Sequence, residues 1–546
     1  MLRDGVTVVL LLLGTALYAA ALVVWAPQPF EDAAILMRYA QHLAEGHGIV
    51  WNVGEPPVDG ATDFLFMLLL AGLHRGGLGL EAATRAVGIL SHLATVVLIY
   101  AAVRRLHGTP RWMAATSAAY LAVGPGLSYA SAGFGTPFFV LFAALTWHCA
   151  NRLAAADPER ESGFDSSRVT HHASRIFACW PLLFALSGLV MGLIRPEGVF
   201  LALFMLGAVV FVRGLRASWK AIAWFIVVFG VLGGAYFAWR WWYFGQPLPN
   251  PFYKKGGGML HWGALVSAIR GSLTFSLPFA LPFIAGFRSR ATARWAVFAL
   301  IPIGGFVGIW VLMSDAMNYL WRFQYAVQPI VLMSWPPLVA GLAEEWRLPR
   351  WSELARRARV MLGVLGGIVF MWLLVYHYRA SRLPVRYEDG NAAIGRMLRD
   401  YSRKGYTMAV SEAGLLPFYS RWRALDTWGL NDQAIARTGR ITEERLAAEA
   451  PHIIAFHAYF SPLVPPVVRN EWDEMVVFLQ AYAQRHGYIL AAVYGETPYD
   501  TQHFYVRPDF PDAPELLRRI RSTPYTQMSS GRACLNFAPS PPEVGP

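Results

Sequence analysis

The sequence predicts a polytopic α-helical membrane protein that carries a smaller mixed α/β domain after its last membrane helix. Three observations predict this fold class. Hydrophobic residues make up 55% of the 546 residues and charged residues only 15%. The apolar residues form blocks close to the ~20 residues that a helix needs to cross hydrocarbon, and beyond about residue 380 the apolar runs shorten to strand length. This pattern excludes a purely soluble globular protein.

The apolar blocks predict about eleven transmembrane helices. They lie at 5–25, 82–103, 111–129, 136–153, 177–194, 196–213, 220–240, 272–288, 293–313, 322–343 and 359–378. The first block exceeds the ~7–15 apolar residues of a cleaved signal peptide, so we expect it to be retained. The stretch Phe64–Leu73 is too short to cross comfortably, and we interpret it as re-entrant or interfacial.

The basic residues indicate an orientation for these helices. The net charge is +12, but Lys and Arg fall in short loops between apolar blocks rather than along one polar face, which argues against a nucleic-acid partner. The positive-inside rule then places Met1 in the cytoplasm of a multi-pass plasma-membrane protein. The cytoplasmic clusters would be Arg104/Arg105/Arg111, Arg213/Arg216/Lys220, Arg288/Arg290/Arg294 and Arg347/Arg350/Arg356/Arg357/Arg359.

Two external loops and the C-terminal domain face the opposite, extracytoplasmic side in this interpretation. We divide the chain into a membrane domain, 1–379, with external loops 26–81 and 241–271, and a C-terminal α/β domain, 380–546. Within the first loop, Ala33–Ala44 is predicted to be an amphipathic helix on the membrane surface. In the C-terminal domain, strands are predicted at Tyr406–Val410, His452–His457 and Tyr488–Val493, and helices at Glu443–Glu449 and Glu471–Arg485.

The acidic pair Glu31 and Asp32 directly follows the first span, at the lipid–water boundary. Carboxylates there are costly unless they are hydrated, paired or functional. A carboxylate beside an acceptor hydroxyl is also what general-base catalysis requires. By itself, an acidic pair after a span is more often ordinary topology, so the pair alone does not indicate catalysis.

The surrounding motifs carry a resemblance that covers nearly the whole chain. Within the first loop they are Glu31–Ala40, Glu45–Glu55 and Asp59–Leu65; further along they are Arg195–Gly198, Tyr243–Lys255, Asp315–Arg322, Ser411–Tyr419 and Asp426–Asp432. In order and external placement they resemble bacterial polyprenyl-phosphate-dependent glycosyltransferases of the GT-C class, in particular the terminal arabinofuranosyltransferases of mycobacterial cell-wall synthesis. Two positions depart from that pattern: Glu31 stands where relatives usually carry Asp, and Gly135 where many carry Glu.

The resemblance implies a GT-C-like fold and transfer of a sugar, arabinofuranose from decaprenylphosphoryl arabinose, to a cell-envelope glycan. Asp32 or Glu31 would be the general base. The phosphate requires cations, and the candidates are Lys254, Lys255, Arg195 and Arg322. Each lysine could instead contact lipid headgroups, and Arg195 could pair with Glu197 or Asp315 to hold helix ends.

Further candidates fall into two groups. Substrate contacts are predicted for Arg38, Asp59, Asn250, Tyr253, Glu197 and Asp315, and acceptor contacts for Glu412, Tyr419 and Trp428. Asp59, Asp63, His47 and Asn52 either order the first loop or bind the acceptor. The aromatic run Trp239 to Phe244 is either a sugar-stacking wall or an interfacial belt. A divalent cation, Mg²⁺, Mn²⁺ or Ca²⁺, is left open because no ligand spacing requires one.

Two other function classes compete with this interpretation. A transporter or flippase also has many spans with a few intramembrane charges, but the sequence has no visible inverted repeat and its notable acids lie in an external loop. A protein or lipid-linked oligosaccharide glycosyltransferase shares the external acid and the lipid phosphate and differs in donor and acceptor.

Overall fold

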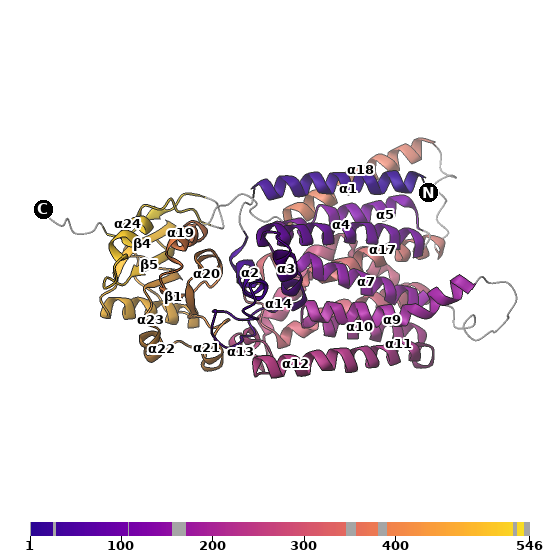
Figure 1. Cartoon of the computed structure of the whole chain (residues 1–546). Helices are drawn as coiled ribbons and strands as arrows, with labels where there is room; N and C mark the ends of the chain where they lie inside the picture. Colours follow the sequence, from indigo (N-terminus) through magenta and orange to yellow (C-terminus); the bar gives the residue numbers. More distant parts are fainter. Residues whose placement is uncertain are drawn as a thin grey trace.

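A bundle of long helices forms the first part of the protein, and a mixed α/β domain is attached at one end of it (Figure 1). The computed structural model describes residues 2–25, 29–106, 109–155, 171–345, 356–380, 390–527 and 532–539. Each of the eleven predicted apolar segments is largely helical within this part of the chain. Two residues of the last predicted cytoplasmic cluster, Arg347 and Arg350, lie outside the described residues.

The bundle and the first loop contain the following helices: α1 (Leu2–Trp25), α2 (Glu31–Ala44), α3 (Phe64–Arg75), α4 (Leu80–Leu106), α5 (Arg111–Ala122), α6 (Gly126–Ser131), α7 (Thr136–Ala155), α9 (His171–Ile194), α10 (Glu197–Arg213), α11 (Leu215–Val227), α12 (Gly234–Phe244), α13 (Asn250–Lys254), α14 (Trp262–Ser276), α15 (Ala280–Gly286), α16 (Arg290–Gly308), α17 (Val327–Glu345) and α18 (Arg356–Ala380). A π-helical turn, η1 (Val228–Gly233), joins α11 to α12 without a break.

Seven helical segments among the described residues are long and apolar enough to cross a membrane. They are Arg3–Ala21, Leu80–Arg105, Thr136–Ala155, Leu215–Phe244, Trp262–Gly286, Arg290–Leu312 and Tyr319–Glu344. The protein is therefore a multi-pass membrane protein, and the finer count of eleven crossings stays a prediction. Helix α3 is about 18 Å long at 1.5 Å per residue, short of the ~30 Å hydrocarbon thickness, which agrees with a segment that does not cross.

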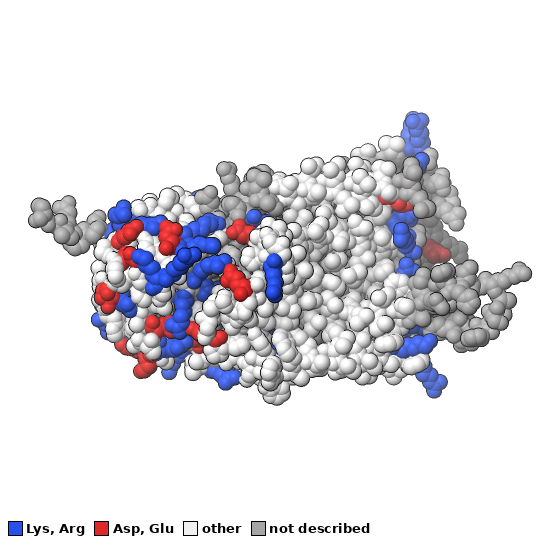
Figure 2. All heavy atoms as spheres, viewed as in Figure 1, with Lys and Arg blue, Asp and Glu red and all other residues white. Residues whose placement is uncertain are grey.

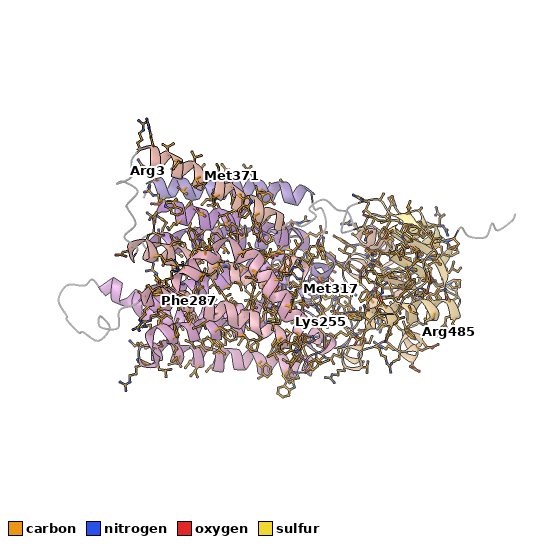
Figure 3. The ribbon with its side chains drawn as sticks, turned by 180° about the vertical axis from the view of Figure 1, so that it is seen from behind. Arg3, Lys255, Phe287, Met317, Met371 and Arg485 are labelled. Carbon is orange, nitrogen blue, oxygen red and sulfur yellow. The ribbon has the colours of Figure 1, made fainter. Side chains whose placement is uncertain are left out.

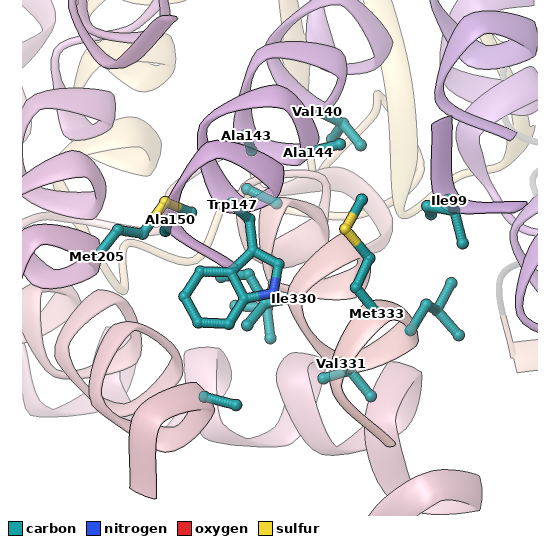
Figure 4. Packing of buried hydrophobic residues seen from close by; sticks show 14 of the residues in the cluster. Ile99, Val140, Ala143, Ala144, Trp147, Ala150, Met205, Ile330, Val331 and Met333 are labelled. Atoms are coloured by element: carbon teal, nitrogen blue, oxygen red, sulfur yellow. The ribbon is translucent and has the colours of Figure 1, made fainter. Parts of the chain in front are cut away.

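The bundle core is packed from small and large apolar side chains on alternating helices. Trp147 of α7 is fully buried and stacks on Phe298 of α16 with ring centroids 4.6 Å apart. Figure 4 shows Ala143 and Ala150 on the same helix beside Trp147, with Ile330 of α17 close to the indole. Alanines at these positions let neighbouring helices approach, as is usual at helix interfaces in membranes.

Charges are concentrated at the two ends of the molecule. Figure 2 shows Lys and Arg at the end of the bundle away from the C-terminal domain, with a nearly uncharged belt between. Asp4 of α1 accepts hydrogen bonds from the Nε atoms of Arg104 and Arg111, both at 3.1 Å, so the N-terminus and the α4–α5 loop lie at this same end. The predicted orientation, with this end cytoplasmic, agrees with the placement and stays a prediction.

The C-terminal domain is built on a six-stranded sheet with strand order β2-β1-β3-β5-β4-β6. Its strands are β1 (Thr407–Val410), β2 (Arg423–Asp426), β3 (Ile453–Ala458), β4 (Ile489–Thr497), β5 (Asp500–Val506) and β6 (Leu535–Asn536). Strand β1 pairs in parallel with β2 and β3, and the remaining pairs are antiparallel. The helices are α19 (Gly390–Leu398), α20 (Leu415–Ser420), α21 (Gln433–Thr438), α22 (Glu443–Glu449), α23 (Glu471–Arg485) and α24 (Ala513–Arg521).

Helix α2 is enclosed on nearly all sides between the bundle and the C-terminal domain. It was expected to lie on the membrane surface with a polar face in water, but Arg38, Gln41 and His42 are buried. The guanidinium of Arg38 donates to the carbonyls of Trp51, Pro417 and Trp422. The C-terminal domain thus covers the polar face that would otherwise be solvated.

Candidate active site

One cavity lies at the junction between the bundle and the C-terminal domain. It encloses about 760 Å³ of space between protein atoms, including its open mouth. Lys255 and Met317 mark this junction in Figure 3, far from Phe287 at the other end of the bundle. The polar and charged side chains that line the cavity are Asp32, Thr62, Asp63, Thr136, Arg195, Lys255 and Arg322.

The two carboxylates of the acidic pair point to different places. Asp32 lines the cavity. Glu31 is buried and turned to the C-terminal domain, where its Oε1 accepts hydrogen bonds from the backbone amides of Gly414 at 2.5 Å and Leu415 at 3.0 Å. Because consecutive residues of a helix point about 100° apart, one helix can present Asp32 to the cavity and Glu31 to the domain.

Gly414 is needed for this docking. A Cβ atom at this position would lie 1.9 Å from the backbone oxygen of Glu31 and 2.7 Å from its Oε1. Real side chains do not approach so closely, so any other residue would push the first turn of α2 away from the domain.

Arg322 connects Asp32 to the rest of the cavity. Its Nη2 donates to Asp32 Oδ2 at 2.7 Å, and its guanidinium carbon lies 4.0 Å from the ring centre of Phe134. The side chain is only 9% exposed, and within the part of the chain that the structure describes its Nε and Nη1 atoms have no hydrogen-bond partner. A buried guanidinium with unsatisfied donors is costly unless an anion completes it.

The backbone before Arg322 is held in an unusual conformation. Met317, Leu320 and Trp321 have φ angles of 65°, 49° and 55°, in the left-handed region that non-glycine residues rarely adopt. The hydroxyl of Tyr129 donates to the carbonyl of Leu320 at 2.6 Å. Gly271 leaves room for Trp321, because a Cβ there would lie 2.6 Å from the indole. Such strain is commonly found at functional sites.

The two adjacent lysines also diverge. Lys255 lines the cavity, and its Nζ donates to the carbonyl of Ala316 at 2.9 Å. Burial lowers the pKa of Lys255 to about 8; Asp32 acts in the opposite direction, and Arg322 lowers the pKa further. Lys254 points away from the cavity: its Nζ donates to the carbonyl of Gly439 at 2.5 Å.

Arg195 lies in the cavity wall within a small ion network. Its Nε donates to Glu197 Oε1 at 2.6 Å, and its Nη1 lies 3.4 Å from Asp63 Oδ1. The predicted pairing with Glu197 is present, whereas Asp63 takes the place that was considered for Asp315. Burial raises the pKa of Asp63, and the charge of Arg195 lowers it.

Gly135 stands where many of the glycosyltransferases that this sequence resembles carry Glu. The structure gives a physical reason for glycine at this position. A Cβ at position 135 would lie 2.5 Å from Asp63 Oδ2 and 2.8 Å from the ring of Phe66. The space that a side chain would need is therefore filled by the Asp63 carboxylate. From the sequence, Asp63 was predicted only to order the loop or to bind the acceptor. Its position directly before α3 was the sequence feature that could have indicated a place in the cavity.

Most of the other predicted substrate contacts lie outside the cavity. Arg38 is fully enclosed by carbonyl groups and by Asn52 Oδ1 at 3.0 Å. Asp59 forms a buried bidentate ion pair with Arg240 of α12, with both N–O distances 2.7 Å. Asn250 is buried and accepts from Gln246 at 2.5 Å. Tyr253 packs on Phe252.

Asp315 and the predicted acceptor residues also take other positions. Asp315 is partly exposed and raises the pKa of Lys255 through its charge. Tyr419 is buried and donates to Glu81 at 2.7 Å. Glu412 accepts from Gln502 at 2.6 Å, and Trp428 lies under the ammonium of Lys254. Leu430, which sequence reasoning missed, is the residue of the C-terminal domain that reaches the cavity wall.

The aromatic run at the end of α12 does not line the cavity. Trp242 is 78% exposed and Trp241 is also exposed on the outer surface of the bundle. Trp239 and Tyr243 instead stack on each other, and the Tyr243 hydroxyl accepts from the backbone amide of Ile49. The exposed pair is typical of an interfacial belt.

The donor set of the cavity does not fit a divalent cation. Asp32 and Asp63 are each paired with an arginine, and Lys255 adds a third positive charge. The described residues contain no group of three His, Cys, Asp or Glu side chains arranged to hold a metal ion. Oxygen ligands already neutralised by guanidinium groups bind cations poorly, so the electrostatics favour an anion.

Comparisons with known proteins agree with this architecture. Residues 379–505 match a family model described as a domain of unknown function, DUF8728. No curated protein is significantly similar in sequence to this chain. Among solved structures, the apo form of ArnT from Cupriavidus metallidurans is 16% identical, with a TM-score of 0.55, over 91% of this chain and 97% of that one.

Two further structures are more distant. The undecaprenyl-phosphate-bound form of the same ArnT is 14% identical over 90% of this chain and 97% of that one, with a TM-score of 0.48. The apo oligosaccharyltransferase of Archaeoglobus fulgidus is 11% identical over 81% of this chain and 69% of that one, also at 0.48. The similarity to apo ArnT shows the fold alone: this chain is a multi-pass helical membrane protein with a GT-C-like fold and a C-terminal mixed α/β domain.

Proposed function

We propose that this chain is a membrane glycosyltransferase that transfers a sugar from a polyprenyl-phosphate donor to a glycan acceptor at the extracytoplasmic surface. The observation that carries the proposal is the half-satisfied guanidinium of Arg322. Its Nη2 holds the carboxylate of Asp32, and its Nε and Nη1 are buried and have no hydrogen-bond partner among the described residues. A base and an anion site are thereby joined in one place.

The phosphate of the donor is assigned to Arg322 and Lys255, with Arg195 as a third cation in the wall. The Nε and Nη1 of Arg322, which lack partners among the described residues, are candidates to donate charge-assisted hydrogen bonds to phosphate oxygens. Lys255 adds an ammonium, which the carbonyl of Ala316 holds in the cavity wall. As the sugar–phosphate bond breaks, negative charge grows on the phosphate, and preorganised cations stabilise that charge. Lys254 has no part in this step.

Asp32 is assigned the role of general base. An acceptor hydroxyl attacks the anomeric carbon while its proton passes to a carboxylate oxygen of Asp32. The bond from that carbon to the phosphate oxygen breaks, and its electron pair leaves with the polyprenyl phosphate. Direct displacement of this kind inverts the anomeric centre. Glu31 supports Asp32 from the next position on α2 by anchoring the helix to Gly414 and Leu415.

The finer identity of the substrates rests on the family resemblance. The motifs of the first loop support arabinofuranose as the sugar, carried by decaprenyl phosphate, and a cell-envelope glycan as the acceptor. The distribution of positive charge supports a bacterial plasma membrane with the cavity on the outer face. Asp63, paired with Arg195, supplies a second carboxylate in the cavity for contact with sugar hydroxyls.

The test is transfer by the purified full-length protein reconstituted in lipid. It is incubated in turn with radiolabelled polyprenyl-phosphate arabinose, mannose and glucose, each with an arabinan oligosaccharide acceptor and with a peptide acceptor. We expect label in the arabinan product from the arabinose donor. Transfer of mannose or glucose alone would correct the sugar, transfer to peptide would correct the acceptor, and no turnover of any donor would reject the proposal.

A further inference from the structure

The C-terminal sheet has a topological switch point between β1 and β3. These neighbouring parallel strands are followed by α20 and α23, respectively. Leu415 of α20 packs with one face of the sheet, and Leu479 of α23 packs with the other. In open α/β sheets, the connections that follow two such strands run in opposite directions. A crevice that can bind a ligand then forms at the carboxyl ends of the two strands.

Polar side chains converge at this edge of the sheet. Glu412 follows β1, His457 lies near the end of β3, and Asp500 begins β5. His457 Nε2 lies 2.5 Å from Asp500 Oδ1, and its Nδ1 lies 3.6 Å from Glu412 Oε1. Gln502 donates to Glu412 at 2.6 Å. We call Glu412, His457, Asp500 and Gln502 the edge cluster; its charged members are partly exposed.

A row of aromatic rings leads from the cavity loop to the edge cluster. It begins beside Lys254, the neighbour of the cavity residue Lys255. The ammonium of Lys254 lies 3.9 Å from the ring centre of Trp428. Trp428 and Trp472 have ring centres 5.1 Å apart, and the Trp472 indole donates to the carbonyl of His457 at 3.0 Å. Tyr459, which is 48% exposed, ends the row 5.1 Å from the His457 ring.

The edge cluster is also close in sequence to the residues that hold the base. Glu412 precedes Gly414 by two residues, and Gly414 contacts Glu31, the neighbour of Asp32. Leu430, two residues after Trp428, lines the cavity itself. The segment that contains Glu412 therefore also contacts α2, and the segment that contains Trp428 also lines the cavity.

We propose that the aromatic row (Trp428, Trp472 and Tyr459) and the edge cluster form a binding site for the acceptor glycan, which positions a chain of neutral sugars so that one end enters the cavity. This inference rests on the proposed function and adds residues to it. Aromatic faces stack on the C–H faces of sugar rings. The edge cluster offers both donors and acceptors, as sugar hydroxyls require. Its two carboxylates, Glu412 and Asp500, disfavour an acidic glycan.

The test is equilibrium binding of a linear arabinofuranosyl hexasaccharide to full-length protein in detergent micelles, measured by calorimetry in the Asp32→Asn background so that no turnover occurs. Tyr459→Ala and Glu412→Gln are the test variants. Ile489→Ala is the control. Ile489 is similarly exposed, at 46%, but it pairs with Val506, at the end of β5 opposite to Asp500. Unchanged thermal unfolding midpoints establish that the variants are folded.

We expect both test variants to raise the Kd for the hexasaccharide by about three- to tenfold, the size of one lost stacking contact or hydrogen bond. The control should bind as its parent does. Equal binding by all four proteins, or no binding by the parent, would overturn the inference. If hexasaccharide binding depends on Tyr459 but the wild type turns over no donor, the proposed function fails and the acceptor site stands. If the wild type transfers sugar but hexasaccharide binding does not depend on Tyr459, only the acceptor site fails.

Discussion

Arg322 donates from Nη2 to Asp32 Oδ2 at 2.7 Å, and across the described part of the chain its Nε and Nη1 remain without partners. One guanidinium therefore contacts the candidate base and keeps two donors for an anion. In the proposed reaction, the attacking hydroxyl would approach Asp32 while the leaving phosphate is held by the remaining donors of the same guanidinium. This arrangement also explains why Phe134 lies against the guanidinium, since an apolar wall keeps the fork poorly hydrated and strengthens its interactions.

Asp32→Asn should abolish most of the transfer activity. General-base catalysis contributes roughly 10²- to 10⁴-fold, so kcat should fall by at least about 100-fold with donor affinity retained. Steady-state transfer and equilibrium donor binding by the purified variant check both parts.

Glu31→Gln is the matched comparison for Asp32→Asn. The amide oxygen still accepts from the backbone of Gly414 and Leu415 without the charge, so kcat should fall by less than about tenfold. Full activity in the Asp32→Asn, Glu31→Gln double variant, or equal losses in the two single variants, would contradict these roles.

Donor affinity should decrease as the pH rises through about 8. Lys255 binds phosphate only when protonated, and its pKa is lowered to about 8. Affinity for a sugar phosphodiester donor, whose charge is constant in this range, should be flat below pH 7 and then decline toward a limit of tenfold per pH unit. Lys255→Arg, which stays charged, should remove the decline. The same decline in Lys255→Arg would show that another group titrates.

Gly414→Ala should loosen the contact between α2 and the C-terminal domain. The new Cβ would lie 1.9 Å from the backbone oxygen of Glu31, and relieving such overpacking costs about 1–3 kcal/mol. The thermal unfolding midpoint and kcat should both fall. Gly79→Ala is the control, since a Cβ there meets nothing within 4 Å. Equal midpoints for the two variants would mean that the domain does not dock as described.

Asp59→Asn should reduce stability rather than act on the chemistry alone. It would leave Arg240 buried beside a neutral group, and breaking a buried ion pair on one side costs about 3–5 kcal/mol. Denaturant unfolding in micelles measures the loss. Replacing both partners, as in Asp59→Asn with Arg240→Met, should recover part of the stability. If the single variant is as stable as wild type, the pair has no structural role.

Sequence reasoning predicted the helical bundle well because the apolar blocks have the length that hydrocarbon imposes. The C-terminal helices Glu443–Glu449 and Glu471–Arg485 were predicted to the residue, since each begins after a side chain that caps it, Thr442 and Asn470. The strands β1 and β3 were placed within one residue.

Side-chain directions within the motifs could not be predicted in the same way. The pairs Glu31/Asp32 and Lys254/Lys255 were each treated as a unit, but the structure sends one member of each to the cavity and the other to the C-terminal domain. Only tertiary contacts decide which member goes where. Arg38 shows the same limit, because its partner Pro417 is 379 positions away in the chain.

The most direct test of the central claim is binding of polyprenyl phosphate, the leaving group itself, to the purified protein in nanodiscs. The variant is Arg322→Gln, and Arg485→Gln is the control, since Arg485 is exposed on the far side of the C-terminal domain (Figure 3). We predict that the wild type and the control bind alike and that Arg322→Gln binds about 10- to 100-fold more weakly, the value of one or two charge-assisted hydrogen bonds. Equal binding by all three proteins, or none by the wild type, would contradict the account.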